Sequence, residues 1–130
     1  MQLKKMTIEL IVDDVLKTVE FYKNILNFQL INKVMDREKY SWALMNYKNS
    51  IEIMFISRNS VLNEVNDYQV KEIGDDFILL IEMNEIKEFY ESVKGKANLV
   101  KYIENTSYGT TEFAMRDINQ TILMFTERNE

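Results

Sequence analysis

The stretch VDDVLKTVEFYKNILNF at residues 12–28 decides the fold, because the chain repeats something similar as MNEIKEFYESVKG at residues 83–95. Each copy follows a short apolar run, and each carries an aromatic pair, Phe21-Tyr22 in the first and Phe89-Tyr90 in the second. A unit that recurs along a chain is typical of modules that cannot bury their apolar faces alone. The repeat therefore predicts a chain built from two similar halves.

Both copies have the spacing of an amphipathic helix. Asp13 and Asp14 are good N-cap residues before the first helix, and Gly95 is a typical stop after the second. Apolar residues recur every three or four positions: Val15, Val19, Tyr22 and Leu26 in the first copy, and Ile86, Phe89, Tyr90 and Val93 in the second. We expect one helix in each half, with its apolar stripe against a sheet.

Eight short runs around these helices have the composition of β-strands. They lie at residues 6–12, 28–35, 40–47 and 50–56 in the first half, and at 75–83, 98–104, 110–117 and 121–127 in the second. Each half then reads β-α-β-β-β, an α+β arrangement with a helix on one face of a four-stranded sheet. The other face must be hidden by a partner sheet or curved into a ligand cup.

The absence of Cys and His from all 130 residues excludes several kinds of site. A chain of this length is the usual size of one domain, and without Cys it has no disulfide framework. Without His it lacks the commonest general base near neutral pH and the commonest transition-metal ligand. Any catalysis would need Asp, Glu, Tyr or Lys with a shifted pKa, and three glycines cannot form a phosphate loop.

Charge and hydropathy limit the partners. The net charge is −5, and no window concentrates Lys and Arg, so a nucleic-acid surface is not expected. An acidic protein more naturally attracts cationic ligands. No apolar run reaches the roughly 20 residues of a membrane span, and the first ten residues lack the apolar core of a signal peptide. We therefore expect a cytoplasmic protein with no membrane partner.

The first quoted stretch resembles the first-module signature of the vicinal-oxygen-chelate superfamily, which includes glyoxalases, bleomycin-resistance proteins and extradiol dioxygenases. In that signature a strand ends in Asp, and the next helix carries Phe-Tyr and ends in Leu-Gly-Phe, here Leu26-Asn27-Phe28. In the second half, Tyr108-Gly109 and RDINQT at residues 116–121 stand where the family has Arg-Asp-Pro-Asp-Gly-Asn before the last strand.

This resemblance implies a glyoxalase/bleomycin-resistance fold, with two βαβββ modules forming curved mixed sheets around a cup-shaped cavity. A single glyoxalase-like domain would then cover residues 1–130. Its parts would be a first module at residues 1–57, a linker at 58–74, and a second module at 75–130. The polar composition between residues 57 and 76 favours that linker, with a helical turn near VLNEV.

The resemblance also implies four metal-ligand positions, one on the first and one on the last strand of each module. By position they fall on Thr7, Glu52, Ile78 and Met124. A catalytic zinc site uses about three N or O ligands, and one carboxylate does not supply them. We therefore expect no metal and no cofactor. A register shifted by two residues would instead bring Glu9 and Glu82 to these positions.

The same register assigns side chains to the cup, because strand neighbours alternate faces. The residues expected to contact a ligand are Trp42, Glu52, Tyr40, Met54, Glu9, Glu112, Arg116 and Met124. We expect Trp42 and Glu52 to belong to one ligand site. In the structural alternative, Trp42 fills space between the sheets, and Glu52 forms an ion pair with Arg116.

Three functions remain open. The favoured one is a metal-independent protein that sequesters a cationic or aromatic, antibiotic-like small molecule, as the bleomycin-resistance branch does; cation–π contacts and carboxylates would recognise it. The alternatives are a glyoxalase- or dioxygenase-type lyase, isomerase or oxygenase with atypical metal ligands, and a non-catalytic regulatory or interaction module. The resemblance further implies a homodimer, because proteins of this kind mostly close their cups across a two-fold axis.

Overall fold

The structure, a computed structural model, describes residues 1–65, 72–74 and 76–130. They form two compact units, Met1–Lys71 and Glu72–Glu130. The elements of the described residues, in chain order, are β1 (Ile8–Val12), α1 (Val15–Leu26), β2 (Gln29–Asp36), β3 (Lys39–Tyr47), β4 (Ile51–Ser57), α2 (Arg58–Glu64), β5 (Ile78–Glu82), α3 (Ile86–Val93), β6 (Asn98–Asn105), β7 (Thr110–Arg116) and β8 (Ile122–Arg128). None of these helices is long and apolar enough to cross a membrane.

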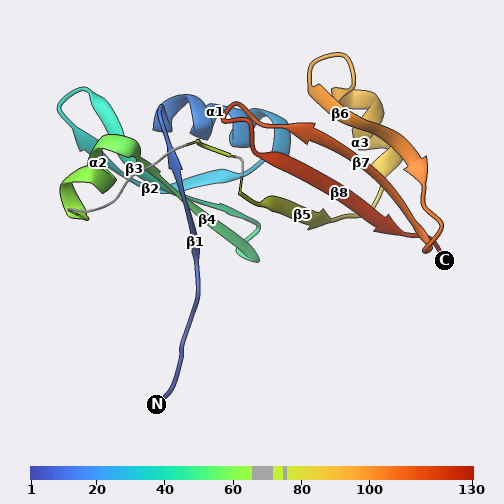
Figure 1. Cartoon of the computed structure of the whole chain (residues 1–130), viewed down its shortest axis with the longest axis horizontal. Coiled ribbons are helices and arrows are strands. Elements are labelled where there is room, and N and C mark those ends of the chain that lie inside the picture. The colour runs from blue at the N-terminus through green and yellow to red at the C-terminus, as the bar shows by residue number, and fades with distance from the viewer. Residues whose placement is uncertain (66–71, 75) are drawn as a thin grey trace. The chain divides into compact units, whose positions relative to one another are not determined.

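The first unit contains a mixed sheet, sheet A, with the strand order β1-β4-β3-β2. β1 and β4 are parallel, and the other neighbours are antiparallel. A tight turn can join only antiparallel strands, so the chain passes through α1, β2 and β3 before β4 returns beside β1. Helix α1 packs against β3 and β4 on one face of this sheet (Figure 1).

The second unit repeats this arrangement as sheet B, with the order β5-β8-β7-β6 and a parallel pair of β5 and β8. Helix α3 packs against β7 and β8 (Figure 1). Both sheets also have an irregular register at the same place, between β2 and β3 and between β6 and β7. The repeat in the sequence is therefore a repeat in the structure.

The core of each unit lies between its helix and its sheet. In the first unit, Tyr22 is 1% exposed, and its ring lies 4.9 Å from the ring of Phe55 on β4. In the second unit, the ring of Phe89 lies 5.0 Å from that of Phe125 on β8. Burying one large apolar side chain contributes about 1.5–3 kcal/mol, so these rings are a large part of what holds each helix on its sheet.

The aromatic pair that reveals the repeat does not occupy the same place in the two helices. Phe21 and Tyr22 are the seventh and eighth residues of the twelve in α1. Phe89 and Tyr90 are the fourth and fifth residues of the eight in α3. A shift of three positions is close to one helical turn of 3.6 residues, and the second member of each pair still contacts a ring of its sheet, Tyr22 with Phe55 and Tyr90 with Phe113.

Two positions where the resemblance predicts glycine keep the backbone that glycine favours. Asn27 ends α1 with φ 60°, and Gln120 has φ 68° in the turn before β8. Positive φ is uncommon for residues other than glycine, and Asn tolerates it better than most. These departures from the family signature therefore change the side chain and not the course of the chain.

The predicted α+β fold of two βαβββ modules is confirmed, with each predicted strand and both predicted helices present. A cup-shaped cavity bounded by both sheets stays a prediction. Helix α2 occupies the start of the predicted linker at 58–74, and its first turn is capped by Ser57, whose Oγ accepts the N–H of Ser60 at 3.2 Å. Residues 66–71 of that linker and residue 75 of the second module lie outside the described residues.

Gly74 packs against the turn that precedes β8. It has φ +91°, and a Cβ there would lie 2.5 Å from the carbonyl oxygen of Asn119 and 2.9 Å from the nitrogen of Thr121. The turn is held in place by the buried carboxylate of Asp117, which accepts the N–H of Asn119 at 2.7 Å and that of Thr121 at 3.0 Å. The turn can therefore not move away easily from an added methyl group at position 74.

We expect Gly74→Ala to lower the free energy of unfolding by about 1–3 kcal/mol, because the methyl group adds a backbone clash to an unfavourable left-handed conformation. Gly95→Ala is the matched control, since a Cβ at Gly95 meets nothing within 4 Å. Its effect should stay within roughly 0.5 kcal/mol of zero. Urea unfolding followed by circular dichroism measures both, and equal losses for the two variants would contradict the packing argument.

Candidate functional site

The face of sheet A turned away from α1, here called the open face of sheet A, carries the first group of predicted contacts. On the α1 side, the four side chains in the middle of β3 and β4 are at most 6% exposed: Ala43, Met45, Ile53 and Phe55. The side chains that alternate with them are partly exposed: Tyr40, Trp42, Leu44, Glu52 and Met54. Burial in the middle of β3 and β4 therefore follows the predicted alternation, whereas Ile56, opposite Trp42 at the end of β4, is 6% exposed.

The register between β3 and β4 separates Trp42 from Glu52. Trp42 lies opposite Ile56, Leu44 opposite Met54, and Asn46 opposite Glu52. Successive rows are two residues apart, which is about 7 Å along a strand. Trp42 and Glu52 therefore stand about 13 Å apart along the sheet. A compact ligand cannot reach both, whereas an elongated one can.

Glu52 has a partner within its own unit. The ammonium of Lys5 lies 2.6 Å from its Oε1, and both side chains are partly exposed. Arg116, the partner in the structural alternative, instead donates through Nη1 to the carbonyl oxygen of Gln120 at 2.8 Å. A cationic ligand at Glu52 would have to displace Lys5, which is feasible because exposed ion pairs contribute at most about 1 kcal/mol.

Asn46 presents an unpaired acceptor beside Glu52. Its Nδ2 donates to Oδ1 of Asn49 at 3.1 Å, but its own Oδ1 is buried and has no hydrogen-bond partner among the described residues. A buried acceptor without a donor costs about 1–3 kcal/mol, so this atom favours a ligand with an N–H or O–H group. The sequence prediction missed Asn46, although this residue lies four positions after Trp42 on the same strand and therefore on the same face.

Glu9 and Tyr40 lie at two borders of the open face of sheet A. Glu9 is beside Met54 in the pairing of β1 with β4, is exposed, and has no ion pair within the described part of the chain. The hydroxyl of Tyr40 accepts from Nζ of Lys33 at 3.1 Å, and that ammonium lies 4.8 Å from the ring centre. Glu9 is thus available to a ligand, and Tyr40 is engaged with the outer strand β2.

The open face of sheet B, turned away from α3, holds the remaining predicted contacts. Its cross-strand rows are an apolar one of Leu80, Met124 and Ala114, and a polar one of Glu82, Thr126, Glu112 and Glu104. Arg116 lies one row beyond Ala114, opposite Ile122. The structure therefore brings Met124 and Arg116 to one face, with Glu112 in the adjacent polar row.

Glu112 is the centre of a hydrogen-bond network and is 7% exposed. Its Oε1 accepts from the hydroxyl of Tyr108 at 2.9 Å and from Nζ of Lys101 at 3.3 Å. Its Oε2 accepts from the hydroxyls of Thr110 and Thr126, each at 3.0 Å. An ionised carboxylate has about four acceptor positions, so a ligand would have to displace one of these donors.

The network also sets the protonation of its members. Burial disfavours the charged form of Glu112, but the hydrogen bonds from Tyr108, Thr126, Thr110 and Lys101 outweigh it and lower the pKa of this carboxyl group. The hydrogen bond to Glu112 in turn raises the pKa of the Tyr108 hydroxyl. The pKa of Glu112 and that of Tyr108 are therefore both shifted further from neutral pH. A general acid or base works best with a pKa near the operating pH, so these shifts do not favour such a role for either group.

The strand pairings test whether the side chains fit a metal. On sheet A, Glu9 stands beside Met54, and the same register extended by one residue puts Thr7 beside Glu52. On sheet B, the pairs are Ile78 with Ile122, Leu80 with Met124, and Glu82 with Thr126. Each pair offers at most one carboxylate, with or without a two-residue shift. The described residues contain no group of three His, Cys, Asp or Glu that could hold a metal, and this donor set does not fit a transition-metal site.

A cavity of about 470 Å³ lies elsewhere, on the α3 side of sheet B, and none of the eight predicted contacts lines it. Its lining residues are Glu85, Lys87, Glu88, Asn105, Thr111, Glu127 and Asn129. They come from the start of α3 and from the ends of three strands, which meet only in the folded chain. No motif or spacing in the sequence connects them.

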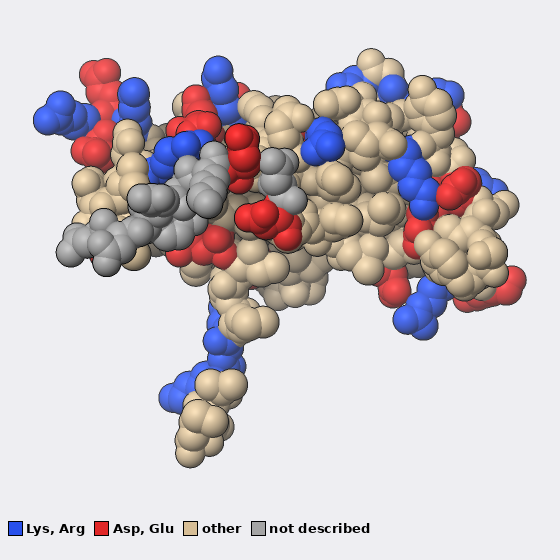
Figure 2. Space-filling view, viewed as in Figure 1, with Lys and Arg blue, Asp and Glu red and all other residues tan. Residues whose placement is uncertain are grey.

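The charged side chains form no single-sign surface in the view of Figure 2. On that face, the basic and acidic side chains of the described residues are interspersed. A phosphate backbone binds to a concentrated basic surface, and the absence of a nucleic-acid partner stays a prediction.

The chain matches the family model of the Glyoxalase/Bleomycin resistance protein/Dioxygenase superfamily over residues 6–129. Since the match covers almost the whole chain and the fold agrees with it, the protein belongs to this superfamily. A comparison with curated proteins finds no match.

Several solved structures share the fold. A glyoxalase/bleomycin resistance protein/dioxygenase from Nocardioides has a TM-score of 0.80 at 12% identity, over 100% of this chain and 86% of that one. A glyoxalase-related enzyme from Fulvimarina pelagi has a TM-score of 0.78 at 12% identity, over 98% and 89%. TioX from Micromonospora sp. ML1 has a TM-score of 0.72 at 16% identity, over 96% and 98%. At these identities the likeness shows the fold alone.

Acid should weaken the second unit through Glu112. Because the folded-state pKa of Glu112 is lowered, its contribution to stability is present above its ordinary pKa of 4.5 and is lost as the pH falls through the lower folded value. We expect Glu112→Gln to reduce the free energy of unfolding by about 1–3 kcal/mol at neutral pH. The difference from the unsubstituted protein should shrink in acid, as measured by urea unfolding across the pH range.

Glu82→Gln is the control, because Glu82 lies in the same polar row but is exposed and paired only with the exposed Arg128 at 3.3 Å. It should change stability little at any pH. A loss in Glu112→Gln that does not vary with pH would show that the carboxylate charge is not what the network stabilises.

Proposed function

We propose that this protein is a metal-independent small-molecule-binding protein whose ligand lies along the open face of sheet A. The ligand is an elongated, amphiphilic compound with an aromatic part and an N–H donor, as in many antibiotics. The observation that carries this proposal is a continuous group of partly exposed apolar side chains, Trp42, Leu44 and Met54. This group is followed along β3 by Asn46 with its unpaired acceptor. Ligand sites typically combine such an apolar surface with a few polar groups that fix orientation.

The apolar part of the ligand would lie on Trp42 and its neighbours. An indole offers a large rigid surface on which a planar or cationic group can stack. Met54 and Leu44 continue this surface one row further along β4 and β3. The thioether of Met54 adapts to ligands of different shape, which suits a protein that sequesters rather than transforms its ligand.

The polar part of the ligand would meet Asn46 and the two carboxylates. Once the Asn46 side chain turns its buried Oδ1 outward, an N–H group of the ligand would pair with this oxygen and remove the cost of leaving it unpaired. A positive charge would be attracted by Glu9, and by Glu52 once Lys5 is displaced. The net charge of −5 adds a long-range attraction for cations.

The superfamily does not decide the function, because one fold hosts many activities and the site determines which one is present. In this chain the positions that would bind a metal pair a carboxylate with Met or Thr, or carry no carboxylate. The described side chains thus support binding better than a metal-dependent reaction.

Ligands can be found by screening planar aromatic amines for quenching of Trp42 fluorescence in the presence of a chelator, since Trp42 is the only tryptophan. For a compound found in this way, we expect Trp42→Ala to weaken binding by about 1–3 kcal/mol, the usual cost of truncating an aromatic anchor. Calorimetry measures the affinities. Tyr102→Ala, which removes an aromatic ring that is 75% exposed on β6, should leave them unchanged.

Charge variants test the polar end in the same titrations. Glu9→Gln and Glu52→Gln should weaken a cationic ligand and spare a neutral analogue of the same shape, whereas Lys5→Gln should strengthen the cationic ligand by freeing Glu52. The proposal fails if Trp42→Ala and Glu52→Gln lower the melting temperature without changing the affinity of the folded protein. Stoichiometric metal after dialysis, with binding lost on chelation, would instead favour an enzyme with atypical ligands.

We further propose that the protein is a homodimer. Ile78 and Leu80 on the open face of sheet B are 54% and 67% exposed, and a second copy that covers them would remove apolar surface from water.

Light scattering at micromolar concentration should then give twice the chain mass of 15.5 kDa. Leu80→Glu should shift this mass toward the monomer, while Leu62→Glu on the exposed side of α2 should not. A single species of the chain mass in the unsubstituted protein would contradict the dimer.

A further inference from the structure

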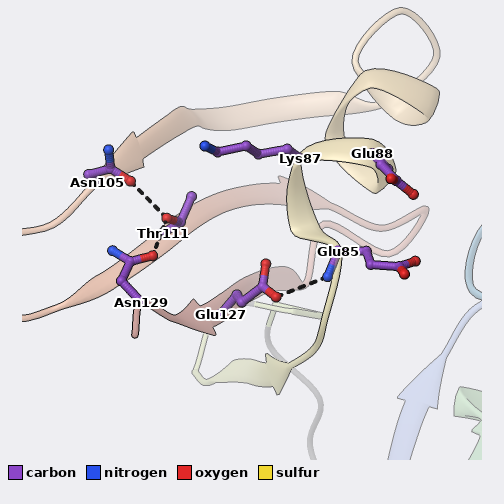
Figure 3. Close-up of a pocket in the computed structure, with 7 residues that line it drawn as sticks. All are labelled: Glu85, Lys87, Glu88, Asn105, Thr111, Glu127 and Asn129. Atoms are coloured by element: carbon purple, nitrogen blue, oxygen red, sulfur yellow. Dashed lines mark hydrogen bonds between the residues drawn. The ribbon is translucent and has the colours of Figure 1, made fainter.

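The cavity beside the start of α3 has no part in the proposed function. Its volume of about 470 Å³ is within the range of pockets that bind small molecules, about 300–1,000 Å³. Figure 3 shows its two sides: the first turn of α3 on one, and the ends of β6, β7 and β8 on the other. It shares no residue with the open face of sheet A, so it is a candidate for a second and independent site.

Two opposite charges border this cavity without neutralising each other. Lys87 extends from α3 toward Asn105 (Figure 3), and no described carboxylate forms an ion pair with its ammonium. Glu127 stands on β8, where its carboxylate accepts the N–H groups of Glu85 and Ile86 at 3.0 and 3.1 Å. These bonds hold Glu127 in place and leave each of its oxygens a further acceptor position.

The position of Lys87 is not explained by helix stability. It is the second residue of α3, where the helix dipole disfavours a positive charge. Glu85 and Glu88, which also line the cavity, point away from Asn105 and Thr111 in Figure 3. Lys87 and Glu127 are thus the charged lining residues on the side of the cavity where Asn105 and Thr111 stand.

Asn105, Thr111 and Asn129 form a fixed polar wall. The hydroxyl of Thr111, which is 4% exposed, lies 2.7 Å from Oδ1 of Asn105 and 2.8 Å from Oδ1 of Asn129. A hydroxyl has one hydrogen, so it donates to one of these oxygens at a time and leaves the other with a spare acceptor position. The two side-chain amides therefore offer N–H donors, which point away from Thr111 (Figure 3), and one carbonyl acceptor.

The polar wall continues into a hollow with a mixed lining. This hollow of about 230 Å³ shares Lys87, Asn105 and Thr111 with the cavity, and its lining adds Tyr90 and Glu91 of α3 and Ile103 and Glu104 of β6. The carboxylates of Glu91 and Glu104 are paired with Lys94 and Lys101, which leaves Tyr90 and Ile103 as its apolar surface. A molecule held at the polar wall can therefore place an apolar group between the helix and the outer strand.

We propose that this cavity binds a free α-amino acid with an apolar side chain. The carboxylate of the amino acid pairs with Lys87 and an amide N–H, and its ammonium group pairs with Glu127 and an amide oxygen. Its side chain lies against Tyr90 and Ile103. A purely anionic or purely cationic molecule would meet a like charge on one side of the cavity, and a zwitterion satisfies both sides.

The test titrates L-phenylalanine and L-leucine into ¹⁵N-labelled full-length protein. Saturable shifts are expected at the backbone N–H of Lys87 and at the side-chain amides of Asn105 and Asn129. N-acetyl-L-phenylalanine lacks the ammonium group and L-phenylalaninamide lacks the carboxylate. Each should bind about tenfold more weakly than phenylalanine, the scale of one lost charge-assisted hydrogen bond.

Variants separate this site from general surface charge. Lys87→Gln should lower the affinity for phenylalanine and should not lower that for phenylalaninamide, which has no carboxylate to pair with Lys87 and is repelled by its charge. Lys17→Gln, which removes a lysine from the first turn of α1, should alter neither, and Trp42→Ala should leave this titration unaffected. The proposal is overturned if neither amino acid gives a saturable shift up to its solubility limit, or if Lys87→Gln and Lys17→Gln behave alike.

Discussion

Each four-stranded sheet has two faces. Among the described residues, one long helix packs across each sheet, α1 on sheet A and α3 on sheet B, and it covers one face only. The aromatic contacts of α1 and α3 attach those helices so closely that Phe55, Phe113 and Phe125 are at most 1% exposed. The opposite faces keep partly exposed apolar side chains such as Trp42 and Leu80. Their exposure carries the proposals of a ligand and of a second copy, since apolar surface left in water favours a partner.

Several carboxylates in this protein act as internal partners. Glu112 is saturated by four donors, Glu52 is paired with Lys5, and Glu127 caps the start of α3. A buried carboxylate must be compensated in this way, because an unpaired charge away from water is costly. Among the groups that the proposals use, Oδ1 of Asn46, the carboxylate of Glu9 and the ammonium of Lys87 have no hydrogen-bond or ion-pair partner among the described residues.

The chain has kept the backbone of its superfamily while changing the chemistry of its side chains. Asn27 and Gln120 hold a left-handed conformation at two positions where the signature has glycine. The metal-ligand positions, in contrast, carry side chains that do not form a metal site. Backbone geometry is required for folding, whereas ligand chemistry is required only for one particular function, so the two can diverge separately.

The sequence by itself determined the elements and their order. The 3.6-residue stripe of Val15, Val19 and Tyr22 and the alternation in YSWALMNY are local patterns, and each marks the face that must leave water. The same alternation placed Trp42 and Met54 together on one face of sheet A.

Only the tertiary structure decided how those residues combine into sites. The alternation along a strand predicts which face a side chain lies on, but not its position along the strand direction relative to the next strand. The distance of about 13 Å between Trp42 and Glu52 therefore followed only from the register of β3 with β4. The pairing of Glu52 with Lys5, 47 residues away, and the meeting of Lys87, Thr111 and Glu127 at one cavity depend on contacts between distant parts of the chain. Such contacts leave no periodic trace in a sequence, because any residue with the right charge or size at the right place in the fold can make them.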